Sequence, residues 1–298
     1  MNNQADYRKL PKHTGVFNSP IWLDLVCGPS GWDVLKIQYK NKLGYLPYRT
    51  LGNGAITPGL SGYTLLLDQS GNEQTDNNVL VSLARELRKI NLYNLKIMTK
   101  DFAPFVWEKL KPTPKCTYVI RKKTPEELFR DYDTDLRNRI RKSEKAGVLI
   151  TQNDASEIDT FLETLFENFA QKKLTLPFEK EKMKKIISST INSSGTLLIA
   201  KSPSEFLGGI YLHSDEQRTC YLLGCCNEKG RKLQVSSYLI HQGILKTLDS
   251  GKIFDFEGSS IYTIASYFRD FGGTLEPVWW ILKKGSILER MKNRLSKK

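Results

Sequence analysis

The sequence predicts an α+β fold, a mixed α/β arrangement in which helices and strands do not alternate strictly. The chain has 298 residues, of which 40% are hydrophobic, so a proper core can be buried. Its 13 Tyr, 13 Phe and 5 Trp residues exclude a mostly disordered chain. Short strand-like runs recur among longer helical segments in both halves, and neither half shows a strict β-α-β order.

Helical periodicity is clear in residues 77–90, where the apolar residues fall on one face. Thr124-Pro125-Glu126-Glu127 is a helix start, because Thr can cap, Pro fits the first position and acids favour the first turn. The other elements expected in this half are strands at 33–39, 45–48, 94–99 and 116–121, an apolar run at 63–67, and a helix at 102–110.

Three strand candidates follow one another closely in the second half, at 196–201, 206–213 and 219–225. The other expected elements are helices at about 154–173, 178–191, 233–248 and 261–270, strands at 253–256 and 274–282, and a basic helix at 283–298. A domain boundary near 148–154 would give an N-terminal domain, 1–150, and a C-terminal domain, 151–298. Since no Gly/Ser/Pro-rich linker separates these halves, we expect them to pack tightly.

The balance of charge points to an anionic partner. Lys and Arg number 45 against 32 Asp and Glu, a formal net charge of +13. Such an excess attracts nucleic acid, nucleotides or an anionic membrane face, although a merely basic soluble protein would show it too. The basic residues peak in 137–142 and in 283–298.

Metal chemistry has little support in the sequence. The five cysteines show no zinc-ligand spacing, and none of the three histidines has a second ligand at a useful distance along the chain. We therefore expect reduced thiols and no metal. The first residues carry no apolar signal segment, and no apolar run approaches the roughly 20 residues of a membrane span. We expect a cytoplasmic protein whose charge allows peripheral contact with the inner membrane surface.

Three segments resemble the Fem-type peptidoglycan aminoacyltransferases and their relatives in the GNAT (N-acetyltransferase) superfamily. The first, 135–148, is a cationic helix followed by Ala-Gly-Val. The second and third, 253–259 (Ile-Phe-Asp-Phe-Glu-Gly-Ser) and 266–273 (Ser-Tyr-Phe-Arg-Asp-Phe-Gly-Gly), resemble the closing strand, helix and Phe-Gly turn of the C-terminal domain. The three in this order are much more specific than any one of them.

The resemblance covers most of the chain, is strongest after Asp135 and is thin between Gly71 and Thr134. It implies two tandem GNAT-like domains with an acceptor cleft between them. It also implies an acyltransferase that moves an acetyl or aminoacyl group from acyl-CoA or aminoacyl-tRNA to an amine. The expected acceptor is a small molecule or a precursor of the cell envelope or of a polysaccharide, and tRNA is an expected partner if it carries the donor.

In GNAT domains, the loop before the central helix binds the pyrophosphate of coenzyme A through backbone N–H groups. The matching segment here predicts donor contacts from Gly230, Arg231, Lys232, Gln234 and Ser236. The fingerprint is degenerate, because its second and third small positions fall at best on Val235 and Ser237. This fits aminoacyl-tRNA as the donor, an unusual mode of coenzyme A binding, or an ordinary capped helix.

The resemblance also suggests catalytic residues. Fem-type enzymes carry a Phe-Lys pair near the developing oxyanion, and the matching pair here is Phe268-Arg269, where GNAT enzymes often have a Tyr in place of Phe268. The alternative is that Phe268 belongs to the core and Arg269 is solvated. Asp255 and Glu257 would share one side of a strand, and Glu257 is the better candidate to accept a proton from the attacking amine.

The remaining substrate contacts are expected from residues in three parts of the chain: Trp22, Asp24, Arg137, Arg139, Asp255 and Ser259. No Ser-His-Asp or Cys-His arrangement stands out, so direct attack by the amine is the simpler mechanism. A rival hypothesis is a non-catalytic basic module that binds RNA or anionic lipid. The oligomeric state is not fixed by the sequence.

Overall fold

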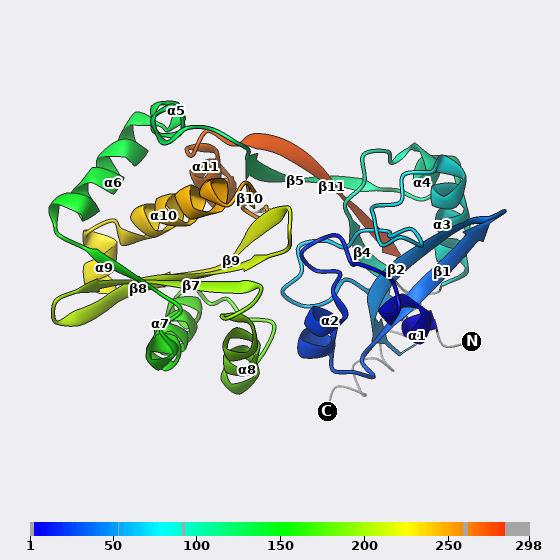
Figure 1. The fold of residues 1–298 in the computed structure, drawn as a ribbon, viewed down its shortest axis with the longest axis horizontal. Helices are drawn as coiled ribbons and strands as arrows, with labels where there is room; N and C mark the ends of the chain where they lie inside the picture. Colours follow the sequence, from blue (N-terminus) through cyan, green and yellow to red (C-terminus); the bar gives the residue numbers. More distant parts are fainter. Residues whose placement is uncertain (1–2, 53, 91–92, 259–261, 284–298) are drawn as a thin grey trace. The chain divides into compact units, whose positions relative to one another are not determined.

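The structure, a computed structural model, describes residues 3–52, 54–90, 93–258 and 262–283 (Figure 1). Dense contacts divide the chain into two compact units, residues 1–116 with 277–298, and residues 117–276. The unit boundary falls within β5 (Thr113–Ile120) and β11 (Thr274–Lys283). This division differs from the expected domains 1–150 and 151–298, which stay a prediction.

The first unit contains a sheet of strand order β1-β2-β3-β4-β11. Its other strands are β1 (Trp32–Tyr39), β2 (Lys42–Leu51), β3 (Gly54–Ile56) and β4 (Tyr93–Ile97). Strands β3 and β4 run parallel, and the other neighbours run antiparallel. The apolar run at 63–67 forms isolated bridges to Tyr45 and Ile97 and no regular strand.

Two helix pairs cover the two faces of this sheet. Successive strand residues point to opposite faces, so Trp32 and Val34 of β1 pack with α1 (Asn3–Arg8) and α2 (Pro20–Cys27). Ile37 packs on the other face with α3 (Asn77–Lys89) and α4 (Ala103–Trp107). Helix α3 confirms the helix expected at 77–90, whereas α1 and α2 were not expected.

The second unit contains a sheet of strand order β5-β10-β9-β8-β7-β6. Its strands besides β5 are β6 (Leu149–Gln152), β7 (Gly195–Ser202), β8 (Glu205–Ser214), β9 (Arg218–Cys226) and β10 (Ile253–Asp255). Strands β9 and β10 are parallel, while β6 to β9 form an antiparallel meander that confirms the three strands expected in succession.

Helices lie on both faces of this second sheet (Figure 1). Helix α10 (Val235–Asp249) packs on β7 to β10, and α6 (Thr134–Lys145) packs on α10. Helices α7 (Ile158–Gln171) and α8 (Lys180–Thr190) cover the opposite face. The shorter helices are α5 (Pro125–Asp131), α9 (Glu228–Lys232) and α11 (Tyr262–Arg269), with a 3₁₀ turn at Ala155–Glu157.

The α+β fold class is confirmed, and local start signals were reliable. Thr124 and Glu127 form the expected capping box of α5, and α6 ends before Gly147, whose φ of +68° is left-handed.

The expected helix at 154–173 is divided into the 3₁₀ turn and α7. The basic helix expected at 283–298 lies almost entirely outside the described residues. Within the described ranges, no helix is both long and apolar enough to cross a bilayer.

We expect Asp76→Ala to destabilise the first unit by about 1 kcal/mol, because the Asp76 carboxylate caps α3 by accepting from the Asn78 and Val79 amides. Urea unfolding at neutral pH measures this loss. Asp76→Asn keeps the cap and serves as the control. An equal loss in both variants would mean that the ion pair with Lys42, rather than the cap, carries the stability.

Candidate functional site

The central feature of the second unit is the edge of β9 that β10 leaves open over residues 221–226. Strand β10 pairs with β9 only from Ile253–Arg218 to Asp255–Cys220. Residues 221–226 of β9 have no strand partner on that side among the residues that the structure describes. An extra residue, Leu222, also bulges between β8 and β9. Bulges and open edges are places where a strand can present its backbone to a ligand.

Aromatic side chains and hydroxyl groups surround this open edge. Phe256 stacks on Phe268 with ring centroids 4.6 Å apart, and Tyr221 meets Phe268 edge-on at 5.9 Å. The Tyr267 hydroxyl lies 3.0 Å from Ser237 Oγ at the start of α10. Burial raises the pKa of Tyr267 to about 12, and it also raises the pKa of Tyr221. Both phenols are therefore neutral near pH 7 and can donate hydrogen bonds.

The first turn of α10 lies at the end of the same strand. Gln234, in the left-handed conformation at φ +63°, separates α9 from α10, and its side chain does not cap α10. Cys226 Sγ lies 3.1 Å from Ser236 Oγ. Burial raises the pKa of the Cys226 thiol despite this hydrogen bond. The Ser236 amide bonds to the same sulfur, and the Ser237 amide donates to the Gln234 carbonyl, so the helix start places hydroxyl groups beside a neutral thiol.

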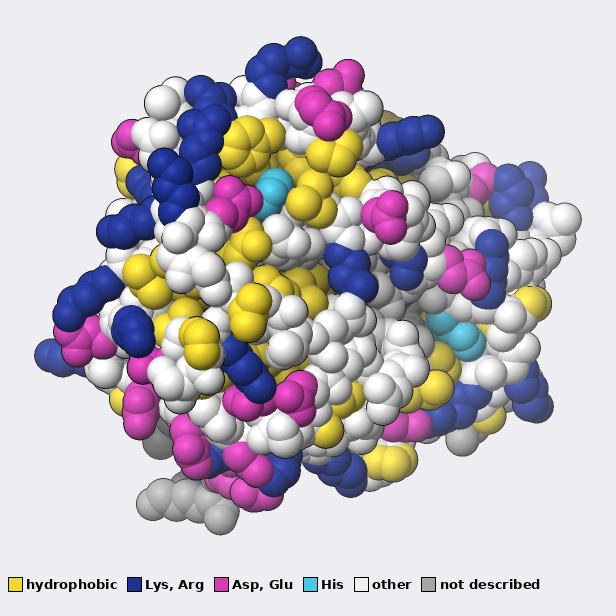
Figure 2. Space-filling model, turned by 60° about the vertical axis from the view of Figure 1, so that its left-hand side comes forward, with side chains coloured by type: hydrophobic (Ala, Val, Ile, Leu, Met, Phe, Trp, Pro, Cys, Tyr) yellow, Lys and Arg dark blue, Asp and Glu magenta, His cyan; other side chains and the backbone are white. Residues whose placement is uncertain are grey.

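Helix α6 adds positive charge beside this helix start. It is anchored by Ser143, whose hydroxyl donates to the Leu233 carbonyl at 2.7 Å, and Figure 2 shows Lys and Arg side chains gathered along one side of this region. The half-buried Arg139 makes no hydrogen bond or ion pair to another described residue. Its charge acts on the Tyr267 hydroxyl and the Asp270 carboxyl. Arg139 is thus a cation available to a bound anion.

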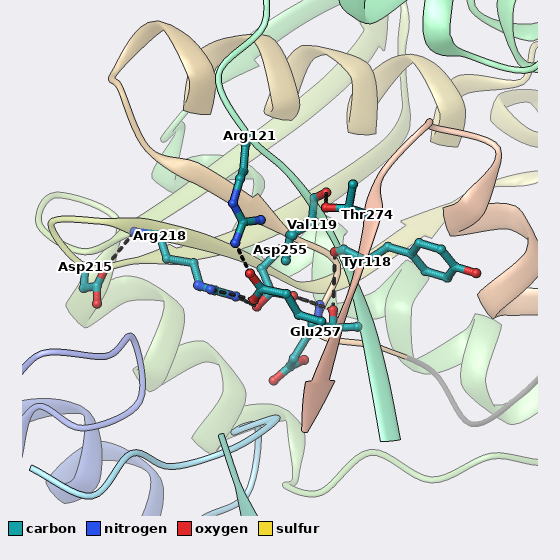
Figure 3. A network of polar contacts seen from close by, with 10 residues as sticks. Tyr118, Val119, Arg121, Asp215, Arg218, Asp255, Glu257 and Thr274 are labelled. Atoms are coloured by element: carbon teal, nitrogen blue, oxygen red, sulfur yellow. Dashed lines mark hydrogen bonds and ion pairs between the residues drawn. The ribbon is translucent and has the colours of Figure 1, made fainter. Parts of the chain in front are cut away.

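A buried polar network fixes the point where β9 and β10 separate (Figure 3). The fully buried Asp255 accepts from Thr117 Oγ1 at 2.5 Å and from Arg218 Nη1 at 2.6 Å. Arg218 also donates to Glu276 at 2.8 Å, and Arg121 donates to the same carboxylate. Burial opposes ionisation of Glu276, but the two guanidinium groups outweigh it and lower the pKa of this carboxyl below 4.5.

The network also sets the conformation of Glu257. The Glu257 amide donates to Asp255 Oδ1 at 2.8 Å, and Glu257 has a left-handed φ of +60°, followed by Gly258 at +73°. The expectation that Asp255 and Glu257 alternate on one regular strand is therefore wrong, because β10 ends at Asp255. Left-handed conformations are uncommon for residues other than Gly, so the turn depends on the hydrogen bond that Asp255 accepts from the Glu257 amide.

Three solved structures are similar to this chain over most of its length. The structure of FemX is 12% identical, with a TM-score of 0.65 over 94% of this chain and 95% of that chain. The C-terminal domain of a putative lysylphosphatidylglycerol synthetase from Agrobacterium fabrum is 10% identical, with a TM-score of 0.60 over 95% and 93%. L-PGS from Bacillus licheniformis is 13% identical, with a TM-score of 0.55 over 88% of each chain.

The chain has a Fem-like fold. The α+β fold predicted from the sequence is thereby confirmed. No family model matches the chain, and no curated protein sequence matches it. At these identities the likeness is one of fold, so the chemistry has to be argued from the site itself.

Within this Fem-like fold, the residues expected to be catalytic differ in environment. Phe268 is buried among Phe256, Tyr221 and Tyr267. Arg269 is exposed at the end of α11, and its guanidinium donates to Ser266 Oγ at 3.1 Å. Glu257 is half-buried in its left-handed turn. Phe268 therefore belongs to the aromatic cluster beside the open edge of β9. The roles of Arg269 and Glu257 remain predictions.

Most of the residues expected to bind the donor form hydrogen bonds or ion pairs with neighbouring residues of the same segment. The Gly230 amide donates to Asn227 Oδ1 at 2.7 Å, which caps α9. The Arg231 guanidinium donates to the Cys226 carbonyl, and Lys232 pairs with Glu228 on the surface. Gln234 and Ser236 are the members of this set at the start of α10. Gly230 is required for packing, since a Cβ there would lie 2.0 Å from the Leu207 carbonyl oxygen.

The expected substrate contacts do not all lie in one unit. Trp22 and Asp24 belong to the first unit, where the Trp22 indole donates to Ser61 and Asp24 pairs with Arg8. Arg137, Arg139 and Asp255 belong to the second unit. Arg137 donates to the Arg130 and Tyr132 carbonyls and to Thr134 Oγ1, so it is an internal brace. Ser259 lies outside the described residues.

The sequence reasoning missed the residues that organise the site: Arg218, Glu276, Thr117, Tyr221 and Tyr267. A single Arg at a strand start and a Tyr within an apolar strand are ordinary in sequence. The usable signal was Asp255 itself, because a carboxylate inside an apolar strand requires a buried partner. Among the described residues, no group of three His, Cys, Asp or Glu side chains could hold a metal ion.

We expect Arg218→Met to destabilise the protein by about 3–5 kcal/mol at pH 7, because it leaves the buried Asp255 carboxylate without its cation. Glu276 has a lowered pKa in the folded state, so its stabilising contribution is present above pH 4.5 and is lost as the pH falls further. The difference in free energy of unfolding between the native protein and Arg218→Met should therefore shrink in acid. Urea titrations from pH 3 to pH 8 measure it, with the exposed Arg130→Met as control. A pH-independent difference would contradict this account.

A second substitution separates packing from donor binding at Gly230. Gly230→Ala should lower the free energy of unfolding by about 1–3 kcal/mol, because the new methyl group clashes with the Leu207 carbonyl. Lys232→Ala removes only a surface ion pair and should change stability by less than about 0.5 kcal/mol. Thermal unfolding of both variants checks this, and an unaltered midpoint for Gly230→Ala would show that the backbone can move away at little cost.

Proposed function

We propose that the protein is an acyltransferase of the aminoacyl-transferring kind, with its donor bound along the open edge of β9. The observation that carries this proposal is the convergence of that edge, the start of α10 with its serine hydroxyl groups, and the available cation Arg139 in one unit. An extended acyl or aminoacyl ester can bond to the strand backbone, while its phosphate-bearing part lies against the helix start and Arg139. The Fem-like fold supports the same reaction class.

Aminoacyl-tRNA is the donor that we favour over acyl-CoA. The backbone amides that hold a compact pyrophosphate in other GNAT domains include one that Asn227 already occupies here, at Gly230. Segment 228–232 is also a short helix rather than an open loop. By contrast, the outward cations of α6 suit a long phosphate backbone. Coenzyme A remains the competing donor in the test below.

The reaction needs no covalent enzyme intermediate. An acceptor amine attacks the ester carbonyl, the carbonyl oxygen becomes an oxyanion, and the ester oxygen leaves on the donor. Neutral phenols such as those of Tyr221 and Tyr267 can donate to a developing oxyanion or to the leaving oxygen. Glu257 is the proposed acceptor of the ammonium proton, and Arg269 is a proposed second source of positive charge. The larger contribution comes from holding the two reactants together.

The acceptor is proposed at the level of its chemistry, as a primary amine on a small molecule or on an envelope precursor. One of the similar structures is the C-terminal domain of a putative lysylphosphatidylglycerol synthetase, a name that joins an amino acid to an anionic lipid. This supports a polar acceptor that carries an anionic group. We place the reaction in the cytoplasmic compartment, where aminoacyl-tRNA is available.

The decisive experiment offers the full chain two labelled donors in parallel, a pool of aminoacyl-tRNA and acetyl-CoA, with a panel of amines. We expect transfer from aminoacyl-tRNA. Arg139→Gln should lower kcat/KM by about 10- to 100-fold, as expected for loss of one charge-assisted contact. Lys145→Gln removes one charge from the same helix and should cost less than about threefold.

Two outcomes would contradict the proposal. Transfer from acetyl-CoA alone would replace the donor, and Arg139→Gln would then be expected to affect coenzyme A binding. No transfer from either donor, together with RNA or vesicle binding that falls steeply with salt, would favour the non-catalytic basic module.

A further inference from the structure

A separate feature of the first unit is the apolar end of α4, which its own core does not cover. Phe102, Val106 and Trp107 are 39%, 48% and 62% exposed, while Pro104 and Phe105 between them are buried. Phe102 and Val106 lie one helical turn apart and share a side. One side of the helix therefore packs in the core, and the other side exposes large apolar side chains. Exposed apolar clusters of this kind indicate interaction sites.

Lysines flank this apolar group along the chain. Lys100, Lys109 and Lys111 are exposed, and none forms an ion pair with a residue in the described ranges. The acids nearby are already engaged, since Glu108 pairs with Arg85 and Arg88, and Asp101 caps the Ala103 amide. The α4 patch, defined as Phe102, Val106, Trp107, Lys100, Lys109 and Lys111, thus combines apolar side chains with uncompensated positive charge.

We propose that the α4 patch docks the protein on an anionic phospholipid bilayer. Trp and Phe suit the boundary between headgroups and acyl chains, and Val106 adds apolar area that gains by leaving water. Lysine side chains extend their charged ends to lipid phosphates while their stems lie along the apolar surface. The charge complementarity selects an anionic surface over a zwitterionic one.

The stacking of Phe102 favours lipid over single-stranded RNA. Bases bind aromatic residues by stacking on a ring face, but Phe102 already stacks on Trp279 with centroids 4.1 Å apart. Val106 has no ring face to offer. Insertion into a bilayer needs exposed apolar edges and not ring faces, so Phe102 can insert while it stays stacked on Trp279.

Docking does not depend on the transferase activity proposed for the second unit. It involves other residues and another class of ligand, so either proposal can fail alone. If both hold, the protein would bring its amine acceptor and its donor together at a membrane surface.

The test is flotation of the full chain with vesicles of phosphatidylcholine alone or mixed equally with phosphatidylglycerol. We expect binding to the mixed vesicles only. Val106→Ser with Trp107→Ser should lower the partition coefficient at least about tenfold, and Lys109→Gln with Lys111→Gln by about fivefold for each lysine. Ile21→Ser, at a 73% exposed position of the same unit, is the matched control and should stay within about twofold. Circular dichroism confirms that each variant is folded.

A second measurement places the contact within the bilayer. Brominated phosphatidylglycerol should quench part of the tryptophan fluorescence of the native chain and less in the Trp107→Ser variant. Equal partition of the native and α4 variants would overturn the proposal, as would equal loss in Ile21→Ser. Binding of polyuridine that quenches Trp107 and that vesicles do not displace would assign the α4 patch to RNA instead.

Discussion

The second unit depends on the buried carboxylate of Asp255. A charge without solvent contact is tolerated only when its oxygens are bonded and a cation compensates it, and Asp255 meets both conditions through Thr117, Arg218 and the Glu257 amide. These groups belong to β5, to β9 and to the turn after β10, so one side chain determines where the parallel pairing stops. Because its oxygens are already engaged, Asp255 is a positioning residue, and the open edge begins directly beyond it.

Much of the fold could be predicted because it follows from local rules. The apolar face of α3, the capping box at Thr124 and the glycine after α6 are each written in a few neighbouring residues. The boundaries of helices and strands that were misplaced from the sequence have a different origin. Gln234 and Glu257 adopt left-handed conformations that their residue types do not predict, and the turn at Glu257 depends on Asp255, which Thr117 and Arg218 hold from other strands. The ends of the elements around the site were therefore the hardest part to predict.

The candidate site was predictable in location but not in detail. Segments 228–237 and 253–273 do meet, as the contact between Ser237 and Tyr267 shows. Which residue is available is decided by three-dimensional contacts that composition does not contain. Arg137 and Arg139 are two residues apart on one helix, yet Arg137 braces three backbone and side-chain groups while Arg139 has no such partner among the described residues. Gly230 likewise looked like a phosphate contact and is fixed by packing against Leu207.

The net charge alone does not indicate which ligand a cationic surface binds. The side chains beside each Lys or Arg indicate it better. On α6, Arg139 is accompanied by the hydroxyl groups at the start of α10, which complement phosphate oxygens. On α4, the lysines are accompanied by Trp107 and Val106, which complement acyl chains. Salt weakens electrostatic attraction in both places, but only at α4 does burial of apolar area add a contribution that salt does not screen. Anion binding at α6 should therefore be the more salt-sensitive, and the two surfaces can be distinguished although they carry charge of the same sign.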